Sequence, residues 1–439
     1  MEIRPFRAFR FDSAVVGDAG RCVAPPYDVI SPEQQQSLYE QNEYNIVRII
    51  KAKADPSDND SDNRYTRAAD YLNGWIESGA LKQDATDAIY AYAQDFDVGA
   101  TAFQRLTFVA LARLEEFGPP APVRAHEEIL SKPMLDRLNL KKAIAADLGL
   151  VFMLYEDKIG IADEIIENAM AGQTLLDFID DQDVRHRLFG ITAEEDVGAI
   201  VQMMTDKSCI IADGHHRYTT GLTYSKESTN PAAKYQMLAF TNICHEGLIV
   251  LATHRLVANL EAFDMAKLLA DLERSFEVTK LSFNDSAGAK ADARQKMLDQ
   301  MKARHDNGEK AFGIYGPDKA FYLAVLKDHA SMDAAVPDKS EAYGSLDVAV
   351  LHKLILEQIL GIDEKRRANG ENLQYVKDTP NAIDESIAQV DAGEKQAAFF
   401  MNPIKMSQLI DVTDAGERMP QKSTYFYPKM YTGLTINKL

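Results

Sequence analysis

The chain has 439 residues, 46% of them hydrophobic and 26% charged, and its formal net charge is −19. This is the composition of a globular protein of two or three domains, and the acidic balance argues against a nucleic-acid partner, which binds a basic face. Three cysteines without CxxC spacing argue against a disulfide framework or a zinc ribbon. Neither a signal peptide nor an apolar run long enough to span a membrane is apparent, so we expect a cytoplasmic protein without a membrane partner.

The first 120 residues alternate between helix and strand patterns. Ser31, followed by Pro and Glu, is a predicted helix cap, and apolar residues at helical spacing predict a second helix over 64–78. The β-branched run 44–50, "YNIVRII", predicts a strand. Residues 88–96 and 105–117 predict two antiparallel strands joined by a turn.

The rest of the chain completes the pattern of an α+β fold with largely antiparallel sheets and packed helices. Residues 234–244 and 247–257 predict a strand pair, and 310–327 predicts a hairpin. The pattern of predicted elements changes near residue 259. We therefore expect a first domain over 1–258 and a second α+β domain over 259–439, whose tail folds back on the first.

The stretch "SCIIADGHHRYTT" (208–220) predicts a strand, a glycine turn and the start of a helix. The first N–H groups of a helix lack internal partners and lie at the positive end of its dipole, so this geometry suits an anion. Gly214 lets a ligand approach the backbone. Asp213 has the wrong sign for phosphate, but fits a Mg²⁺ ligand or a general base. The side chains after the glycine add further donors, namely His215, His216, Arg217 and Tyr218.

Two other interpretations of this stretch stay open. A transition metal held by both imidazoles is disfavoured, because adjacent side chains on a helix point about 100° apart, whereas helical zinc ligands are spaced i, i+4. A helix capped by Asp213, with its histidines packed or solvated, needs no ligand at all.

Other segments carry the groups that phosphoryl transfer uses, which are cations for phosphate, a carboxylate for Mg²⁺ and a base. The segment 124–137 supplies Arg124, His126, Glu127, Lys132, Asp136 and Arg137, and the tail supplies Lys422, Ser423, Thr424 and Lys429. The loop after Pro25-Pro26 can present Tyr27 and Asp28 to a ligand, and His254 with Arg255 ends a strand. The alternative for these segments is a solvated helix face, a packed tail or a plain turn.

The sequence resembles the family of domain-of-unknown-function 1015 proteins. The resemblance rests on "IADGHHRY" and on further blocks in the same order, and it covers essentially the whole chain. These blocks are Val23–Ser31, Asn42–Ile49, His126–Leu138, Leu251–Val257 and Met419–Leu434. One departure is Ala125, because family members carry Arg directly before His-Glu, whereas Arg124 is one residue away here.

The run "DGHHR" is also similar to that of free-serine kinases in the ParB/sulfiredoxin-like superfamily. This resemblance implies a ParB/sulfiredoxin-like core around the turn and a small-molecule kinase that uses ATP or ADP with Mg²⁺. Free L-serine or a similar hydroxyl-bearing amino acid is the implied acceptor. The implied catalytic residues are Asp213, His215 and Glu127, with Asp213 and Glu127 as Mg²⁺ ligands. The implied phosphate ligands are Gly214, His216, Arg217, Tyr218, His126, Lys132, Arg137, Lys422, Ser423 and Thr424, and the substrate loop is Tyr27 and Asp28.

Two rival functions stay open. One is a non-catalytic nucleotide-binding regulatory protein, in which the same site switches a partner contact. The other is a metal-dependent hydrolase.

Overall fold

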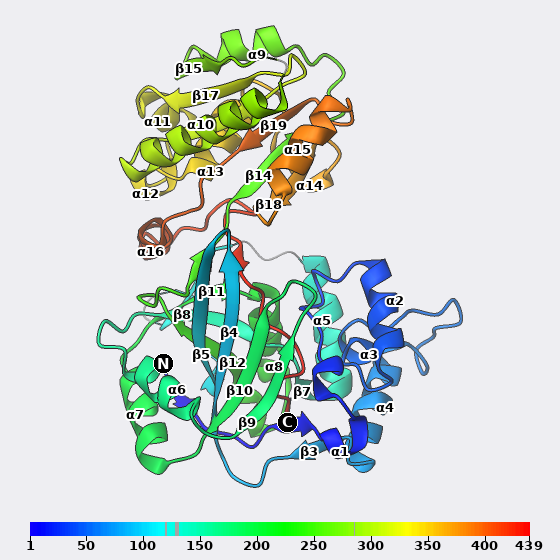
Figure 1. Ribbon diagram of the computed structural model, residues 1–439. Coiled ribbons are helices and arrows are strands. Elements are labelled where there is room, and N and C mark those ends of the chain that lie inside the picture. The colour runs from blue at the N-terminus through cyan, green and yellow to red at the C-terminus, as the bar shows by residue number, and fades with distance from the viewer. Residues whose placement is uncertain (119–120, 128–130, 285) are drawn as a thin grey trace. The chain divides into compact units, whose positions relative to one another are not determined.

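The computed structural model describes residues 1–118, 121–127, 131–284 and 286–439, and the side chains of 131–133 and 287 lie outside the described part. The chain forms two compact units (Figure 1). Unit 1 is Met1–Ile249 with the C-terminal segment Pro428–Leu439, and unit 2 is Val250–Tyr427. The sequence places the boundary after residue 258, whereas the structure places it after Ile249.

Within the described residues, unit 1 is built on a nine-stranded mixed sheet. Its strands are β1 (Ile3–Arg4), β4 (Ile89–Val98), β5 (Thr101–Arg113), β6 (Val123–Ala125), β8 (Val151–Tyr155), β9 (Thr174–Ile179), β10 (Arg185–Ile191), β11 (Cys209–Asp213) and β12 (Tyr235–Asn242). Their order is β6-β11-β8-β12-β5-β4-β10-β9, with β1 paired to β5. The β6–β11 and β8–β12 pairs are parallel, and the other pairs are antiparallel. The predicted α+β class with largely antiparallel pairing is confirmed.

The β4–β5 hairpin supplies the centre of the core. The predicted pairing of its two strands is confirmed, with Val98 opposite Thr101 across a tight turn. Alternate residues of both strands, such as Ala91 and Phe108, point into one apolar cluster. Helices α6 (Ile161–Ala169) and α7 (Glu194–Met204) cover this face of the sheet through apolar residues on one side of each helix (Figure 1).

A second core lies among helices α2 (Pro32–Gln41), α3 (Val47–Ile50), α4 (Arg64–Glu77) and α5 (Ser131–Ile144). The predicted Ser31 cap is confirmed, because its hydroxyl accepts a hydrogen bond from the N–H of Gln34. The predicted strand over 44–50 is wrong, because this run forms α3. Asn45 accepts from the N–H of Val47 and so caps the turn, and burial against α4 outweighs a weak preference for strand.

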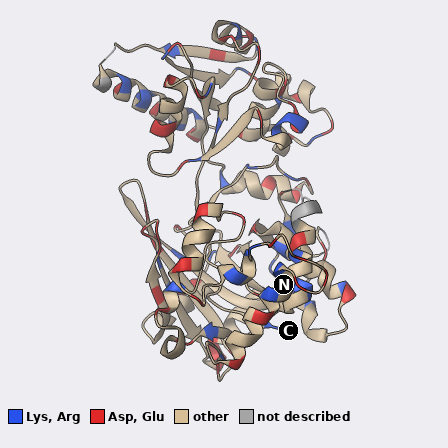
Figure 2. Cartoon of the chain, turned by 90° about the vertical axis from the view of Figure 1, so that its right-hand side faces the viewer, with Lys and Arg blue, Asp and Glu red and all other residues tan. Residues whose placement is uncertain are grey.

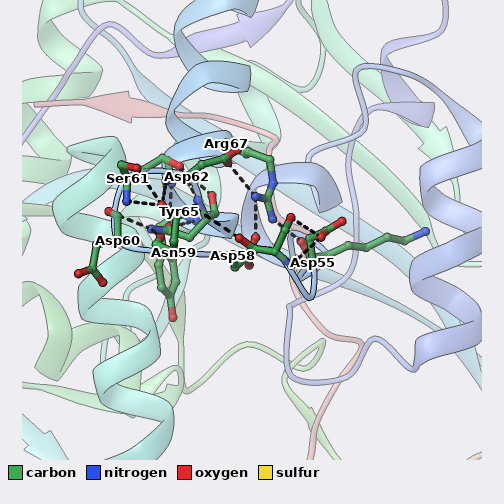
Figure 3. A network of polar contacts seen from close by, with 12 residues as sticks. Asp55, Asp58, Asn59, Asp60, Ser61, Asp62, Tyr65 and Arg67 are labelled. Carbon is green, nitrogen blue, oxygen red and sulfur yellow. Dashed lines mark hydrogen bonds and ion pairs between the residues drawn. The ribbon is translucent and has the colours of Figure 1, made fainter.

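The polar loop before α4 is a self-contained network (Figure 3). Arg67 reaches back to Asp58 at 2.7 Å and to Asp62 at 3.0 Å. Asn63 accepts hydrogen bonds from the N–H groups of Tyr65 and Thr66, which caps the helix. The carboxylates of this loop therefore hold the start of a helix in place.

Within the described residues, unit 2 is built on a six-stranded antiparallel sheet. Its strands, in spatial order, are β15 (Phe276–Leu281), β17 (Phe321–Leu326), β16 (Ala311–Tyr315), β19 (Ala397–Phe400), β14 (Thr253–Val257) and β18 (Leu373–Lys377). The predicted hairpin is confirmed as β16–β17. The predicted pairing of 234–244 with 247–257 is wrong, because β12 lies in the sheet of unit 1 and β14 in that of unit 2. Apolar strands that are neighbours in sequence need not be neighbours in a sheet.

The remaining elements complete the two units. Those of unit 1 are β2 (Phe9–Phe11), β3 (Leu81–Gln83), β7 (Ala146–Asp147), β21 (Asn437–Lys438), α1 (Ser13–Val16), α8 (His215–Glu227) and the 3₁₀ turns Ala19–Arg21 and Pro231–Lys234. Those of unit 2 are α9 (Met265–Leu272), α10 (Ala287–Asp306), α11 (Ala330–Ala335), α12 (Glu341–Gly344), α13 (Asp347–Val350), the π-helix Leu351–Glu357, α14 (Glu364–Asn369), α15 (Ala382–Asp391) and α16 (Met406–Asp414). The short strands β13 (Ile249–Val250) and β20 (Phe426–Tyr427) lie where the chain leaves and re-enters unit 1.

Lys and Arg residues are interspersed with Asp and Glu residues along the chain of both units (Figure 2). None of the helices within the described residues combines the length and the apolar character that a membrane crossing requires.

The surroundings of two glycines of unit 1 predict opposite effects of substitution by alanine on the free energy of unfolding. A Cβ at Gly247 would lie 1.9 Å from the carbonyl oxygen of Gln104 on β5, whereas a Cβ at Gly198, inside α7, would meet nothing within 4 Å. We expect Gly247→Ala to lower the free energy of unfolding by about 1–3 kcal/mol through overpacking. We expect Gly198→Ala to raise it by about 0.5–1 kcal/mol, because alanine favours the helix. Urea denaturation measures both, and equal effects would contradict the packing described for Gly247.

Candidate functional site

The sequence "IADGHHR" forms a strand, a glycine turn and a helix, as predicted. β11 ends at Asp213, Gly214 adopts a left-handed conformation with φ 95° and ψ 28°, and α8 begins at His215. Glycine takes this conformation at little cost because it has no Cβ. As the N-cap residue it also has no side chain that could bond the first turn of the helix. Gly214 therefore does not cap the N–H groups at the positive end of α8, and other groups can bind them.

Asp213 is held by two cations, one from the first turn of α8 and one from the C-terminal segment. Its Oδ2 accepts from Nη2 of Arg217 at 2.6 Å and its Oδ1 accepts from Nζ of Lys429 at 2.9 Å. The Asp213, Arg217 and Lys429 side chains are only 22%, 13% and 16% exposed. Burial acts to raise the pKa of Asp213, but the Lys429 ammonium and the Arg217 guanidinium outweigh it, so this pKa lies below its ordinary value.

This geometry departs from the role predicted for Asp213. Both of its oxygens are occupied by cations, and a carboxylate with a lowered pKa is a weaker base. Asp213 therefore does not fit a general base, and it could ligate Mg²⁺ directly only by giving up one of its two partners. The arrangement suits a residue that positions Arg217 and Lys429 beside the glycine turn.

Arg217 lies directly over this turn. A Cβ at Gly214 would come within 3.0–3.1 Å of its guanidinium, so the glycine is also required by the close approach of the arginine. Nη1 of Arg217 donates to the carbonyl oxygen of Leu150 on the loop before β8. Two cations and the carboxylate of Asp213 thus lie at the start of α8.

The backbone of the C-terminal segment is fixed by a buried polar pair on the β4–β5 hairpin. Gln94 Nε2 donates to the carbonyl oxygen of Lys429 at 3.1 Å, and Arg105 Nη2 donates to that of Pro428 at 2.6 Å. Burial lowers the pKa of Arg105 to about 10, opposed by the charges of Tyr92 and Asp213. Sequence reasoning missed Arg105, and the available signal was a charged residue inside an apolar strand pattern.

The predicted histidines split into a buried pair and a partly exposed one. His126 and His215 are buried, with ring centroids 4.6 Å apart in an edge-to-face arrangement. The backbone N–H of His126 donates to Nε2 of His215 at 3.3 Å, and Nδ1 of His126 lies 2.6 Å from the carbonyl oxygen of Ile211. Burial lowers the pKa of His126. This pair therefore ties the segment after β6 to the start of α8, while His216 is partly exposed.

The other predicted residues near the turn have different surroundings. Glu127 is 29% exposed, with Oε1 4.0 Å from Nε2 of His126. Arg124 lies on β6, opposite Ile210 of β11. Tyr218 is buried, and its hydroxyl both accepts from the N–H and donates to the carbonyl oxygen of Glu115, so it is a packing residue. Lys132 lies in α5, but its side chain is outside the described part of the structure.

A cavity of about 70 Å³ adjoins Arg217. Tyr27 and Arg137, both predicted site residues, line it together with Arg217, and the Arg137 guanidinium lies 4.0 Å from the centroid of the Tyr27 ring. Two buried polar atoms on its walls, Oγ1 of Thr220 and Oε1 of Gln236, have no hydrogen-bond partner among the described residues. The structure thus brings three sequence motifs to one small cavity.

Other predicted residues have different surroundings. Asp28 is exposed. Lys422, Ser423 and Thr424 fall within unit 2. In the described part of the chain, no three His, Cys, Asp or Glu side chains come together in a group that could hold a metal ion.

Fold and site together define an α+β protein with a cation-lined glycine turn at the start of a helix. The chain belongs to the family described as "Protein of unknown function (DUF1015)", whose model matches residues 3–349. No curated protein matches the sequence.

Several solved structures are similar to parts of the chain. A free serine kinase in complex with AMP is 12% identical, with a TM-score of 0.36, over 74% of this chain and 92% of that one. A conserved hypothetical protein from Pyrococcus furiosus is 14% identical, with a TM-score of 0.33, over 73% and 93%. C-terminally truncated SbnI from Staphylococcus aureus is 8% identical, with a TM-score of 0.34, over 75% and 87%.

The lowered pKa of Asp213 predicts a pH-dependent stability. Because its pKa is below the unfolded value of about 3.9, the carboxylate stabilises the fold above that pH, and this contribution is lost as the pH falls towards the folded-state pKa. We expect Asp213→Asn to lower the free energy of unfolding by about 1–3 kcal/mol between about pH 5 and pH 8, and by progressively less below about pH 4.

The matched control is Asp177→Asn, which removes the partner of Arg185 from an ion pair whose side chains are 38% and 50% exposed. Such a pair contributes at most about 1 kcal/mol. Urea denaturation across the pH range measures both variants. A loss for Asp213→Asn no greater than that of the control would contradict the described ion pairs.

Proposed function

We propose that unit 1 binds the phosphates of ATP or ADP at the Gly214 turn and transfers a phosphoryl group to a hydroxyl-bearing amino acid such as L-serine. The observation that carries this proposal is the convergence of Arg217 and Lys429 on a glycine that opens a helix. Helix N–H groups, the helix dipole and two cations are the groups that bind phosphate in proteins. The "DGHHR" resemblance to free-serine kinases supports the same assignment.

In the proposed reaction the acceptor hydroxyl oxygen forms a bond to the terminal phosphorus as the bond from that phosphorus to the bridging oxygen of the nucleotide breaks. The hydroxyl proton passes to a carboxylate. We assign this role to Glu127, because it is partly exposed, whereas both oxygens of Asp213 are occupied. Arg217 and Lys429 stabilise the negative charge on the phosphoryl oxygens, and Asp213 holds both cations in position.

The cavity beside Arg217 is the proposed acceptor pocket. At about 70 Å³ it holds roughly five water-sized groups, since one water needs about 10–15 Å³ of such space. That is the size of a small amino acid. The unpartnered oxygens of Thr220 and Gln236 offer acceptors for an ammonium or hydroxyl group. Arg217 lines the cavity and overlies Gly214, so acceptor and phosphate would be neighbours.

Mg²⁺ enters this scheme as the counter-ion of the nucleotide. Magnesium in such sites is commonly held by substrate phosphates with one or two carboxylates and several waters. Glu127 remains as a carboxylate that could contact it.

The occupied oxygens of Asp213 also favour a second candidate, a protein that binds nucleotide without turnover. The same assay separates the two. We expect the purified full chain, incubated with L-serine, Mg²⁺ and ATP or ADP, to form phosphoserine. Nucleotide binding by calorimetry without any phosphorylated hydroxy amino acid would contradict the kinase and support the second candidate.

If the kinase proposal holds, Glu127→Gln should lower kcat by about 10²–10⁴-fold, the usual contribution of a general base, while leaving the Kd for the nucleotide within a factor of about two. The matched control is Glu116→Gln, since Glu116 is 64% exposed and pairs only with Lys226 among the ion pairs of the described residues. Steady-state kinetics of both variants measure this. An unchanged kcat for Glu127→Gln would remove Glu127 from the mechanism.

Arg217→Met should weaken nucleotide binding by about 10–100-fold, because it removes a charge-assisted contact to phosphate of about 1.5–3 kcal/mol. The control Arg185→Met removes an exposed arginine of the same unit and should leave the Kd unchanged. Calorimetric titration with ADP measures both. Equal affinities for the two variants would place the nucleotide away from the turn.

A further inference from the structure

Unit 2 contains a completely buried arginine in its sheet. Arg255 lies on β14, between β18 and β19, and only 1% of it is exposed. A buried charge is rare in proteins unless it is paired with an opposite charge. The partners of Arg255 therefore decide what this residue does.

The hydrogen-bond partners of Arg255 among the described residues are neutral. Nη1 donates to the carbonyl oxygen of Thr253 and to Sδ of Met401, and Nη2 donates to the carbonyl oxygen of Lys422 at 3.0 Å. Nη2 also lies 3.4 Å from Nε2 of His352. Nε has no hydrogen-bond partner within the described part of the chain.

The charges around this guanidinium are positive. Burial, followed by the charges of Arg255 and Arg367, lowers the pKa of His352 well below its ordinary value. Glu357 approaches Arg367 at 3.7 Å and Lys353 at 3.0 Å. Among the described residues, Arg255 forms no ion pair with a carboxylate. A counter-ion is therefore missing from the side chains that surround it.

A narrow cavity adjoins Arg255 and is lined mainly by hydrogen-bonding groups. Thr253, Asn402, Gln408 and Ser423 line it with Arg255. Asp347 also lines it, but this carboxylate has a cation of its own, Lys310, whose Nζ lies 3.6 Å from Oδ1, and Nδ1 of His305 lies 3.2 Å from Oδ2. The cavity therefore combines Arg255, which has no carboxylate partner among the described residues, with the Asp347–Lys310 ion pair and neutral hydrogen-bonding groups.

The wall of this cavity includes a strained turn. Lys422 has φ 60°, a left-handed conformation that non-glycine residues rarely adopt, and this conformation accompanies the contact between its carbonyl oxygen and Arg255. The Ser423 hydroxyl donates to the carbonyl oxygen of Pro420 across the same turn. Strain of this kind is concentrated at ligand clamps. Two sequence motifs, "LATHRLV" and "MPQKST", thus meet at one place.

We propose that Arg255 anchors a binding site in unit 2 for a small oxyanion, the phosphate or carboxylate group of a ligand. The anion supplies the missing counter-ion, the guanidinium Nε–H donates to it, and the polar side chains on the cavity wall complete its hydrogen bonds. This site uses no residue of the Gly214 turn and does not depend on the function proposed for unit 1.

The first test locates the anion without any substitution. Crystals of the full chain are soaked in tungstate, a heavy analogue of phosphate, and the anomalous difference map is calculated. We expect a peak within hydrogen-bonding distance of the Arg255 guanidinium, whether or not a second peak lies at the Gly214 turn. Tungstate bound at the turn with none at Arg255 would overturn the proposal, and so would tungstate bound at neither.

The second test measures affinity and identifies the class of anion. The full chain is titrated calorimetrically with inorganic phosphate and, separately, with acetate, in an Arg217→Met background that weakens any anion binding at the turn. We expect one of the two anions to bind, and Arg255→Met to weaken it at least tenfold. Because Arg255→Met can disturb folding, Ser423→Ala is the milder second variant and should weaken binding measurably.

The control is Arg274→Met, a substitution at an arginine whose side chain is 80% exposed in the same unit. Unchanged affinity in both the Arg255→Met and Ser423→Ala variants would overturn the proposal. Loss of nucleotide binding in the Arg217→Met background, with anion binding retained, would show that the two sites are independent.

Discussion

The site depends on the half-buried carboxylate of Asp213 and the two cations that it holds. Arg217 is one helical turn away, whereas Lys429 lies 216 residues further along the chain. Gln94 and Arg105, on the β4–β5 hairpin, bind the backbone carbonyls of the C-terminal segment next to the contact with Asp213. The hairpin, the C-terminal segment and the glycine turn therefore form one unit of structure, in which the charge balance of the site is set by residues from three parts of the sequence.

This constraint changes the chemical interpretation of the motif. A lone Asp next to a glycine turn suggests a base or a metal ligand, but a carboxylate paired on both oxygens with a lowered pKa positions cations instead. This arrangement fixes two positive groups beside the start of α8. Preorganised charge of this kind stabilises phosphoryl groups in transfer reactions. The proposed base then has to be another carboxylate, and Glu127 is the one that the neighbouring His126 places near the turn.

Local sequence predicted what local interactions determine. The strand–turn–helix at Gly214, the Ser31 cap and the β4–β5 and β16–β17 hairpins follow from short-range patterns and are confirmed. The wrong predictions concern segments whose structure depends on contacts with residues distant in the sequence. Residues 47–50 form a helix, with the side chain of Asn45 bound to the N–H of Val47 and the apolar side chains buried in the core with α4, and β12 and β14 lie in different sheets. Arg105 could not be assigned to the site, because only the fold reveals that its strand faces the C-terminal segment.

The most direct measurement of the central claim is an electron-density map of the full chain crystallised with ADP and Mg²⁺. The proposal for unit 1 predicts the terminal phosphate within hydrogen-bonding distance of backbone N–H groups at Gly214–His216, with Arg217 or Lys429 in contact with its oxygens. A nucleotide bound elsewhere in unit 1, with the contacts of Asp213 unchanged and no phosphate at the start of α8, would contradict it.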